Sequence, residues 1–323
     1  MLARPALAND PLAWDASDCL PLVEDRCRQM ITASCDAESR THHEVAAACI
    51  HHLQAGGSRI RARLALDAAT HLGLDVRTAV TLATTCELLH NASLIHDDLQ
   101  DRDEHRRGKQ TVWKCFGADV AICAGDLLLS SAYAALAELD APAQFASMMK
   151  TIHLRTAAAI HGQAADIGHR ASPVDTIDAY LRIVSGKSGA LLSLPLELAL
   201  LAAGNAAACG AARAAAESFA IGYQIADDLD DLEKDAGLDG RAATLNLALL
   251  LQRNGCAKDA DHGENRHALA RPLGSLALDP TLHGKCIALA RQHLATAARL
   301  AHALPRRSGS LLAQLAVELD NRL

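Results

Sequence analysis

The stretch LLHNASLIHDDLQDRDEHRRGKQTVW (residues 88–113) closes an apolar run with a dense acidic cluster and then an arginine pair. On a helix, Asp97 and Asp101 are four residues apart and share a face, whereas Asp98 is turned away by roughly 100°. Like charges at this spacing repel and destabilise an isolated helix. A second stretch, YQIADDLDD (223–231), repeats the same acidic pattern.

The two acidic clusters predict a metal site. A hard divalent cation offsets the repulsion, and Mg²⁺ prefers oxygen ligands, often one or two carboxylates together with substrate phosphates. One cluster alone is compatible with a solvated helix end, but two favour metal binding. The predicted ligands are the six aspartates Asp97, Asp98, Asp101, Asp227, Asp228 and Asp231.

Composition narrows the class of protein. The chain has 323 residues, of which 50% are hydrophobic, so it can bury a sizeable core as one large or two ordinary domains. The net charge of −7 and the pI near 6.1 argue against a nucleic-acid-binding surface. The ten cysteines form no CxxC pair, which indicates reduced thiols in a cytoplasmic protein.

The sequence predicts no membrane span. The N-terminus lacks the apolar run of a signal peptide. The longest apolar run, at 190–204, is interrupted by Pro195 and Glu197 and is short of the ~20 residues that a span requires.

The fold class follows from helix-forming residues. Ala and Leu dominate, β-branched and aromatic residues are few, and no strict alternation indicates a strand. We expect a loose arm over 1–20, one all-helical domain over 21–323 and a loop over 254–281. The expected helices lie near 22–54, 59–72, 76–101, 118–139, 142–169, 174–204, 207–233, 241–253 and 282–303.

Basic residues balance the acidic clusters. GGSRIRAR (56–63), the pair Arg106 and Arg107, and the Gly-flanked Lys187 supply cations suited to phosphate oxygens. On the helix before Asp97, small residues lead from the acidic end into an apolar interior. A site that is acidic at its mouth and apolar below suits a substrate with a diphosphate head and a hydrocarbon tail.

These motifs, in this order, resemble the trans-isoprenyl diphosphate synthases, or polyprenyl synthetases. The resemblance runs from Gly56 to about Thr244 and includes AGDLLL (124–129), GQAAD (162–166) and KSG (187–189). It implies an antiparallel helical bundle around a central active-site cavity (the isoprenoid synthase fold), a homodimer and three magnesium ions. The implied reaction joins isopentenyl diphosphate to an allylic diphosphate by ionisation, condensation and elimination.

The resemblance also assigns residue roles. Lys187, Ser188, Gln224, Asp166 and Gln163 would act at the reacting centre, and Tyr223 would pack beneath the isopentenyl unit. The allylic diphosphate would be held by Arg106, Lys187, Gln224 and Lys234. Isopentenyl diphosphate would be held by Arg61, His90 and Arg107, with Arg59 compensating for Ser58, which stands where the family usually has lysine.

Product length is expected to depend on Ala92, Ser93 and Tyr133. In the family that the chain resembles, small residues at the positions of 92 and 93 let the hydrocarbon chain grow past the farnesyl length. Tyr133 is a candidate floor, so we expect geranylgeranyl diphosphate. The alternatives are a farnesyl or longer-chain synthase, or a partner subunit of a heteromeric synthase. A terpene cyclase also uses an aspartate-rich motif, but it does not normally carry the GG…R and RRG elements.

Overall fold

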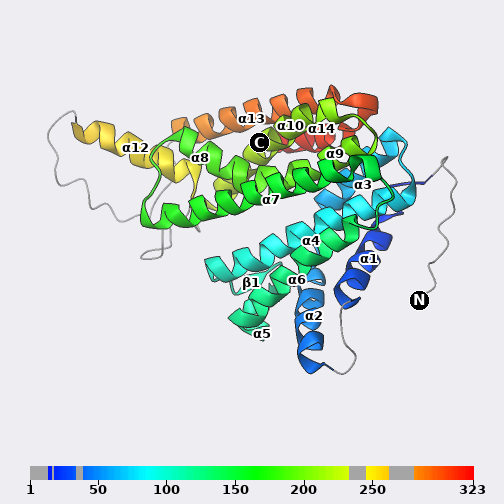
Figure 1. Ribbon diagram of the computed structural model, residues 1–323. Helices are drawn as coiled ribbons and strands as arrows, with labels where there is room; N and C mark the ends of the chain where they lie inside the picture. Colours follow the sequence, from blue (N-terminus) through cyan, green and yellow to red (C-terminus); the bar gives the residue numbers. More distant parts are fainter. Residues whose placement is uncertain (1–13, 17, 34–38, 233–244, 262–279) are drawn as a thin grey trace. The chain divides into compact units, whose positions relative to one another are not determined.

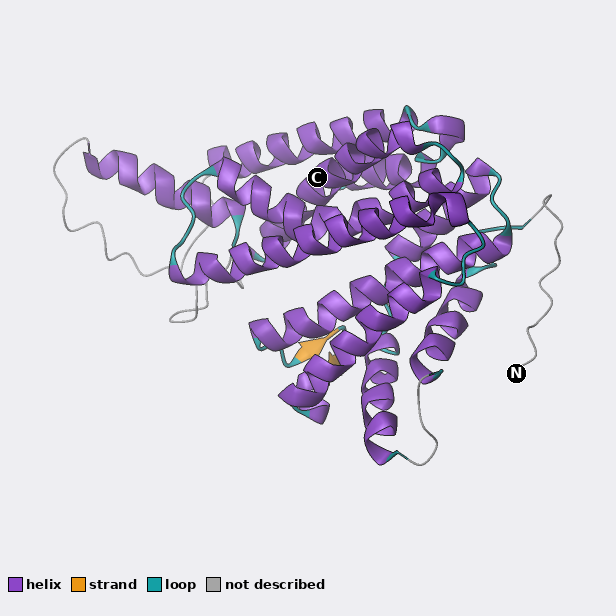
Figure 2. Cartoon of the chain, viewed as in Figure 1, coloured by secondary structure: helices purple, strands orange, loops and turns teal. Residues whose placement is uncertain are grey.

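The computed structural model describes residues 14–16, 18–33, 39–232, 245–261 and 280–323, and the described chain is almost entirely helical (Figures 1 and 2). The only described strands are β1 (His105–Arg106) and β2 (Lys109–Gln110), which pair antiparallel. The all-α class predicted from the sequence is confirmed. The chain divides into two compact units, unit 1 (Met1–Thr156, Ser193–Arg213, Ala301–Leu311) and unit 2 (Ala157–Leu192, Ala214–Leu300, Leu312–Leu323).

Unit 1 is organised around the helix α4 (Val76–Asp101), which packs against α1 (Leu20–Thr32), α3 (Ile60–Leu72) and α6 (Ala118–Leu136). Helix α2 (Arg40–Leu53) and the short α5 (Val112–Phe116) pack against α6, and α4 and α6 lie side by side in Figure 1. Between Ala79 and Ala92 nearly every side chain of α4 is buried. A helix that is enclosed on all faces belongs to the centre of a core.

Unit 2 contains α8 (Ile177–Val184), a π-helical turn η1 (Ser185–Gly189), α12 (Leu247–Asp261) and most of α10 (Cys209–Asp230) and α13 (Pro280–His302). Its buried cluster joins four helices through residues such as Tyr180, Ile225, Leu247 and Cys286. The remaining elements of the chain are α7 (Pro142–Ala171), α9 (Ala190–Ala202), η2 (Ala206–Ala208), η4 (Pro305–Arg307) and α14 (Ser310–Asp320).

Several predicted boundaries were wrong. The helix expected over 22–54 is two helices, because α1 ends at Thr32 and Ser39 starts α2 by accepting a hydrogen bond from the backbone N–H of His42. The loop expected over 254–281 is helical as far as Asp261, and the rest of it (262–279) lies outside the described residues. Helix α14 and the two-residue strands were not anticipated. The single-domain assignment stays a prediction.

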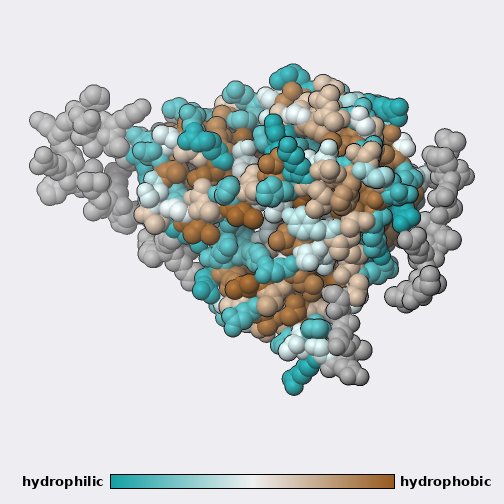
Figure 3. Space-filling view, viewed as in Figure 1, coloured by the Kyte–Doolittle hydropathy of each residue, from teal (hydrophilic) through white to brown (hydrophobic). Residues whose placement is uncertain are grey.

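Two helical stretches, Ala118–Leu136 and Ile177–Ala202, are long and apolar enough to cross a membrane by length and composition. In the most apolar 18-residue window of the second stretch, 78% of the residues are buried, which is the pattern of a core helix; in the first stretch the share is 44%. Figure 3 shows hydrophilic and hydrophobic residues interspersed on the displayed face. The large apolar side chains exposed in the described residues are Leu22, Ile122, Leu154, Ile160, Ile167, Ile177, Tyr223 and Val317.

Candidate active site

The first aspartate motif occupies the last turn of α4. Asp97 and Asp101 are half-buried, whereas Asp98 is only 1% exposed. Nε and Nη2 of Arg106 both lie 2.7 Å from Oδ1 of Asp98, and Nη2 is 3.7 Å from Oδ2 of Asp97. Burial raises the pKa of Asp98, and the hydrogen bond and charge of Arg106 oppose that rise. Arg106 is therefore ion-paired closely with the buried middle aspartate and more loosely with Asp97, while Asp97 and Asp101 are both more exposed than Asp98.

The hairpin that follows α4 explains how Arg106 reaches back to Asp98. Register pairs Arg106 with Lys109, so Arg107 and Gly108 form a two-residue turn, with φ of 52° and 79°. Two consecutive positive φ values define a type I′ turn, which glycine favours at its second position. The sequence RRG therefore builds the turn and directs the two arginines to different partners.

The glycine loop after α2 receives the other basic side chains of this hairpin. Nη1 of Arg107 donates to the carbonyl of Gly56, and Nζ of Lys109 donates to the carbonyl of Gln54 at 2.9 Å. A Cβ at Gly57 would meet the guanidinium of Arg107 in its present position, and the φ of 129° at Gly57 lies in the region that glycine favours. The structure thus brings together the GGSR and RRG motifs that the sequence places far apart.

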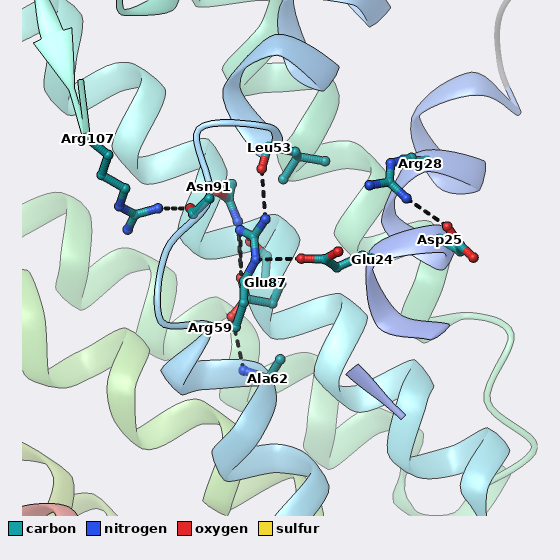
Figure 4. A network of polar contacts seen from close by, with 10 residues as sticks. Glu24, Asp25, Arg28, Leu53, Arg59, Ala62, Glu87, Asn91 and Arg107 are labelled. Carbon is teal, nitrogen blue, oxygen red and sulfur yellow. Dashed lines mark hydrogen bonds and ion pairs between the residues drawn. The ribbon is translucent and has the colours of Figure 1, made fainter. Parts of the chain in front are cut away.

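Arg59 is tied into the core of unit 1 (Figure 4). Its guanidinium lies 3.1 Å from Glu24, 2.8 Å from the carbonyl of Leu53 and 3.8 Å from the buried Glu87. Glu87 also accepts from the backbone N–H of Ala62 at 3.0 Å and so caps the start of α3. Arg59, predicted as a ligand of isopentenyl diphosphate, thus makes three contacts that hold the glycine loop.

The other predicted cations for isopentenyl diphosphate create a positive region in unit 1. Burial lowers the pKa of Arg61 to about 10, and its Nε has no hydrogen-bond partner within the described chain. Burial and then Arg61 lower the pKa of His90, and burial followed by Arg106, Arg107 and Arg59 lowers the pKa of His52 to about 3. Burial is the largest cause of each shift, and for His52 and His90 the neighbouring arginines add to it, whereas Glu87 raises the pKa of Arg61. Several basic groups therefore lie close together here, an arrangement that suits an anion.

The second aspartate motif ends α10. Asp228 is 3% exposed, and its carboxylate accepts hydrogen bonds from three neutral donors. They are the hydroxyl of Tyr180 at 2.7 Å, the backbone N–H of Leu247 at 2.8 Å and Nε2 of Gln224 at 2.9 Å. Asp227 on α10 is exposed, and Asp231, the first residue after that helix, is half-buried. This repeats the first motif, with an inward middle aspartate and two more accessible ones.

A third group of predicted residues lies in unit 2 on α7 and η1. Nζ of Lys187 is 2.6 Å from Oδ2 of Asp166, and Gln163 is one turn before Asp166 on α7. Lys187 and Ser188 lie in the π-helical turn, a feature found frequently at functional sites. A Cβ at Gly162 would strike the backbone of Lys187, so glycine permits α7 to approach this turn closely.

The predicted chain-length residues lie in unit 1. Ala92 is buried in α4, and the hydroxyl of Ser93 donates to the carbonyl of His90 at 2.7 Å. Tyr133 is half-buried in α6, which packs against α4. Lys234 lies outside the described residues.

The carboxylates fit magnesium. Within the described residues, no group of three or more His, Cys, Asp or Glu side chains is arranged to enclose a metal ion. Each aspartate motif instead leaves two more accessible carboxylates at i, i+4, on the last turn of α4 in the first motif and at the end of α10 in the second. This donor set suits Mg²⁺, which is commonly held by one or two carboxylates and completes its shell with water and phosphate oxygens.

Known structures share this architecture. The geranylgeranyl pyrophosphate synthetase from the archaeon Geoglobus acetivorans aligns with a TM-score of 0.75 at 26% identity, over 95% of this chain and 99% of that one. This defines the isoprenoid synthase fold. The sequence profile described as Polyprenyl synthetase matches residues 42–245, and the chain therefore belongs to the polyprenyl synthetase family.

Curated relatives differ in their products. The chain is 37% identical over 174 residues to a (2E,6E)-farnesyl diphosphate synthase from Mycobacterium bovis, covering 54% of this chain and 48% of that protein. It is 33% identical over 193 residues to a geranylgeranyl diphosphate synthase from Mycobacterium tuberculosis, covering 59% and 55%. The matched stretch thus spans about half the length of these relatives.

Three residues at these motifs were not predicted from the sequence: Glu87, Tyr180 and Asn246. Each is buried in the structure and contacts a residue at least 18 positions away through a hydrogen bond. Glu87 could have been identified from the sequence, because a single acid within an apolar run indicates a buried carboxylate that needs a partner. Nothing in the local sequence marked Tyr180 or Asn246 as partners of Asp228.

Proposed function

We propose that the protein is a magnesium-dependent trans-prenyltransferase that condenses isopentenyl diphosphate with an allylic diphosphate. The observation that carries the proposal is the repeated arrangement of the two aspartate motifs. In each, the middle carboxylate is buried among protein donors, while the outer two, four residues apart, are more exposed. Family membership and the names of the relatives support the same reaction.

The residues divide by the substrate that they hold. Asp97, Asp101, Asp227 and Asp231 hold magnesium. Magnesium, when bound, supplies positive charge that stabilises the departing diphosphate. Arg106, Lys187 and Gln224 bind the allylic diphosphate, joined by Lys234 outside the described residues.

Isopentenyl diphosphate is bound by Arg61, His90 and Arg107. The positive region around them, with its lowered pKa values, supports an anion there. His90 is neutral at pH 7 because its pKa is lowered, so it contributes a hydrogen bond rather than a full charge. Arg59 acts indirectly, because its contacts with Glu24, Leu53 and Glu87 hold the loop that precedes Arg61.

The proposed product is geranylgeranyl diphosphate, made by a cytoplasmic homodimer. The support is the small size of the side chains at positions 92 and 93 on α4, and Tyr133 on α6, which packs against α4, is the proposed floor. Replacing Ser93 with Phe is therefore expected to shorten the product, and replacing Tyr133 with Ala to lengthen it. Ser93 is the cleaner site, because a large side chain at the fully packed Ala92 would also strain the core.

The test is a magnesium-dependent assay of the purified chain with isopentenyl diphosphate and, in turn, dimethylallyl, geranyl, farnesyl or geranylgeranyl diphosphate. Product length is read by mass spectrometry. We expect one discrete elongated product that disappears without magnesium and in Asp97→Ala. The matched control is Asp119→Ala, which removes an exposed acid of unit 1 from α6 and should leave the activity unchanged.

Absence of condensation with every primer would contradict the proposal and favour a partner subunit of a heteromeric synthase. A cyclic hydrocarbon released from a single prenyl diphosphate would favour a terpene cyclase. The oligomeric state is read independently by light scattering of the same preparation.

A further inference from the structure

Asp228 connects three helices of unit 2. It belongs to α10, its Oδ2 accepts from the Tyr180 hydroxyl on α8 at 2.7 Å, and the same oxygen accepts from the backbone N–H of Leu247 at 2.8 Å. Leu247 is the first residue of α12. Tyr180 is fully buried, so its ring and hydroxyl are fixed by the surrounding core.

Asn246 reinforces the connection to α12. Its side-chain Nδ2 donates to the backbone carbonyl of Asp228 at 2.8 Å. Its Oδ1 accepts from the backbone N–H of Ala248 at 2.9 Å and of Leu249 at 3.3 Å, which is the arrangement of a helix N-cap. The first N–H groups of α12 are therefore satisfied by Asn246 and by the middle aspartate of the second motif together.

Tyr180 also belongs to the element that carries Lys187. Helix α8 continues into η1 without a break, and Lys187 follows Tyr180 by seven residues. Nζ of Lys187 is held at 2.6 Å from Asp166. The Tyr180 hydroxyl thus links α10, at whose end Asp227 and Asp231 lie, to α8, which leads into the turn that carries Lys187.

We infer that Tyr180 is a positioning residue of the second aspartate motif, which acts by holding Asp228 so that Asp227 and Asp231 keep their orientation toward a divalent cation. The hydroxyl is buried and donates to Asp228, so it acts through that carboxylate. Its contribution is to restrict the rotation of the last turn of α10 relative to α8 and α12. The inference rests on the proposed function insofar as Asp227 and Asp231 bind the cation.

The test compares Tyr180→Phe with wild type in the full-length protein. Direct binding of Mn²⁺, with and without inorganic pyrophosphate, is measured by electron paramagnetic resonance. Loss of one buried hydrogen bond is worth about 0.5–1.5 kcal/mol, so we expect Mn²⁺ affinity to fall about two- to tenfold. In the condensation assay, the half-saturating Mg²⁺ concentration should rise by a similar factor, whereas KM for isopentenyl diphosphate should change less than about twofold.

The matched control is Leu250→Ala. Leu250 is 1% exposed in the same buried cluster on α12, so its truncation destabilises unit 2 without removing a partner of Asp228. An equal loss of Mn²⁺ affinity in this control would show that general loosening is sufficient, and would overturn the inference. Unchanged Mn²⁺ affinity in Tyr180→Phe would overturn it as well.

A double-mutant cycle with Asp228→Asn separates direct from indirect action. If Tyr180 acts through Asp228, the two substitutions should be non-additive in Mn²⁺ affinity, and additivity would contradict the inference. Mn²⁺ binding by wild type without any condensation would overturn the proposed function alone. Failure of wild type to bind Mn²⁺ would overturn both.

Discussion

The two aspartate motifs bury their middle carboxylate by different means. Asp98 on α4 is paired with a full positive charge, the guanidinium of Arg106, with two nitrogen atoms at 2.7 Å. Asp228 on α10 accepts hydrogen bonds from at least three neutral donors, namely a phenol, an amide side chain and a backbone N–H, at 2.7–2.9 Å. The sequences DDLQD and DDLDD give no hint of this difference.

The kind of partner of the middle aspartate decides which changes each motif is sensitive to. A buried carboxylate opposite a guanidinium is stable only while both charges are present, because either one alone is expensive to bury. A carboxylate held by several neutral donors loses one hydrogen bond at a time. The first motif should therefore respond strongly to changes of charge and pH, and the second to changes in the geometry of its neighbours.

The largest expected effect is that of Arg106→Met, which keeps much of the side-chain volume and removes the charge. Asp98 is left buried without its ionic partner, which typically costs about 3–5 kcal/mol. Urea denaturation at pH 7 measures this loss. The double variant Arg106→Met/Asp98→Asn is the control, and it should recover most of the stability because no unpaired charge remains.

The Arg106→Met variant also has a predicted pH dependence. Burial raises the pKa of Asp98, so the folded state binds its proton more tightly than the unfolded chain. Its stability deficit should shrink as the pH falls toward 4 and grow as the pH rises. A deficit that is the same at pH 5 and pH 7 would contradict the buried-charge explanation.

The pKa of His52 responds to burial and to the arginines around it in unit 1. Its pKa is lowered to about 3 by burial and by Arg106, Arg107 and Arg59, whereas an unfolded histidine titrates near 6.5. The unfolded state binds more protons between these values, so stability should fall with the pH below about 6.5, by at most about 1.4 kcal/mol per pH unit. The His52→Gln variant should have a smaller slope over this range, and an equal slope would rule out His52 as its source.

A smaller effect is expected at the second motif for Asn246→Ala. The substitution removes the N-cap of α12 and one contact to Asp228, which together should cost about 1–2 kcal/mol of unfolding free energy. Thr176 caps α8 in the same unit by accepting from the backbone N–H of Ala179. Thr176→Ala should cost a similar amount without lowering Mn²⁺ affinity, whereas Asn246→Ala should lower it.

The smallest effect should come from an exposed ion pair away from both motifs. Arg28 and Asp25 on α1 lie 2.7 Å apart, but their side chains are 47% and 64% exposed. Asp25→Ala is expected to change stability by less than about 0.5 kcal/mol, because such pairs are well solvated. If Asp25→Ala lowered the unfolding free energy as much as Arg106→Met does, an exposed ion pair would matter as much as a buried one. Burial would then not explain the sensitivity of the first motif.

Patterns of short range made the fold predictable. Helix-forming composition and the four-residue spacing of Asp97 and Asp101 were enough to assign the helical class and the shared face, and both are local properties. The break between α1 and α2 was missed although Ser39 is a good N-cap, because the apolar pattern resumes on both sides. Residues up to Asp261 were taken for a loop because Asn254 and Gly255 are poor helix formers in isolation.

The partners of the motifs were harder to predict, because they depend on tertiary packing. Tyr180 and Asp228 are 48 residues apart, and Ala62 and Glu87 are 25 apart. No periodicity joins such positions. The role of Arg59 was predicted from its place beside Ser58, but only the structure shows that three contacts engage its guanidinium.

The π-helical turn at Ser185–Gly189 amounts to one residue more than a continuous α-helix needs over the same span. Deleting a single residue there would restore a regular α-helix over the same span, so the helix beyond the turn would keep the face that it packs. From Ala190 to Leu201 every residue is buried, and the widened turn takes up the extra residue without rotating that buried helix. The extra residue therefore serves the turn that carries Lys187 and Ser188, and a chain with one residue fewer here should still pack α9 but should lose the 2.6 Å contact between Lys187 and Asp166.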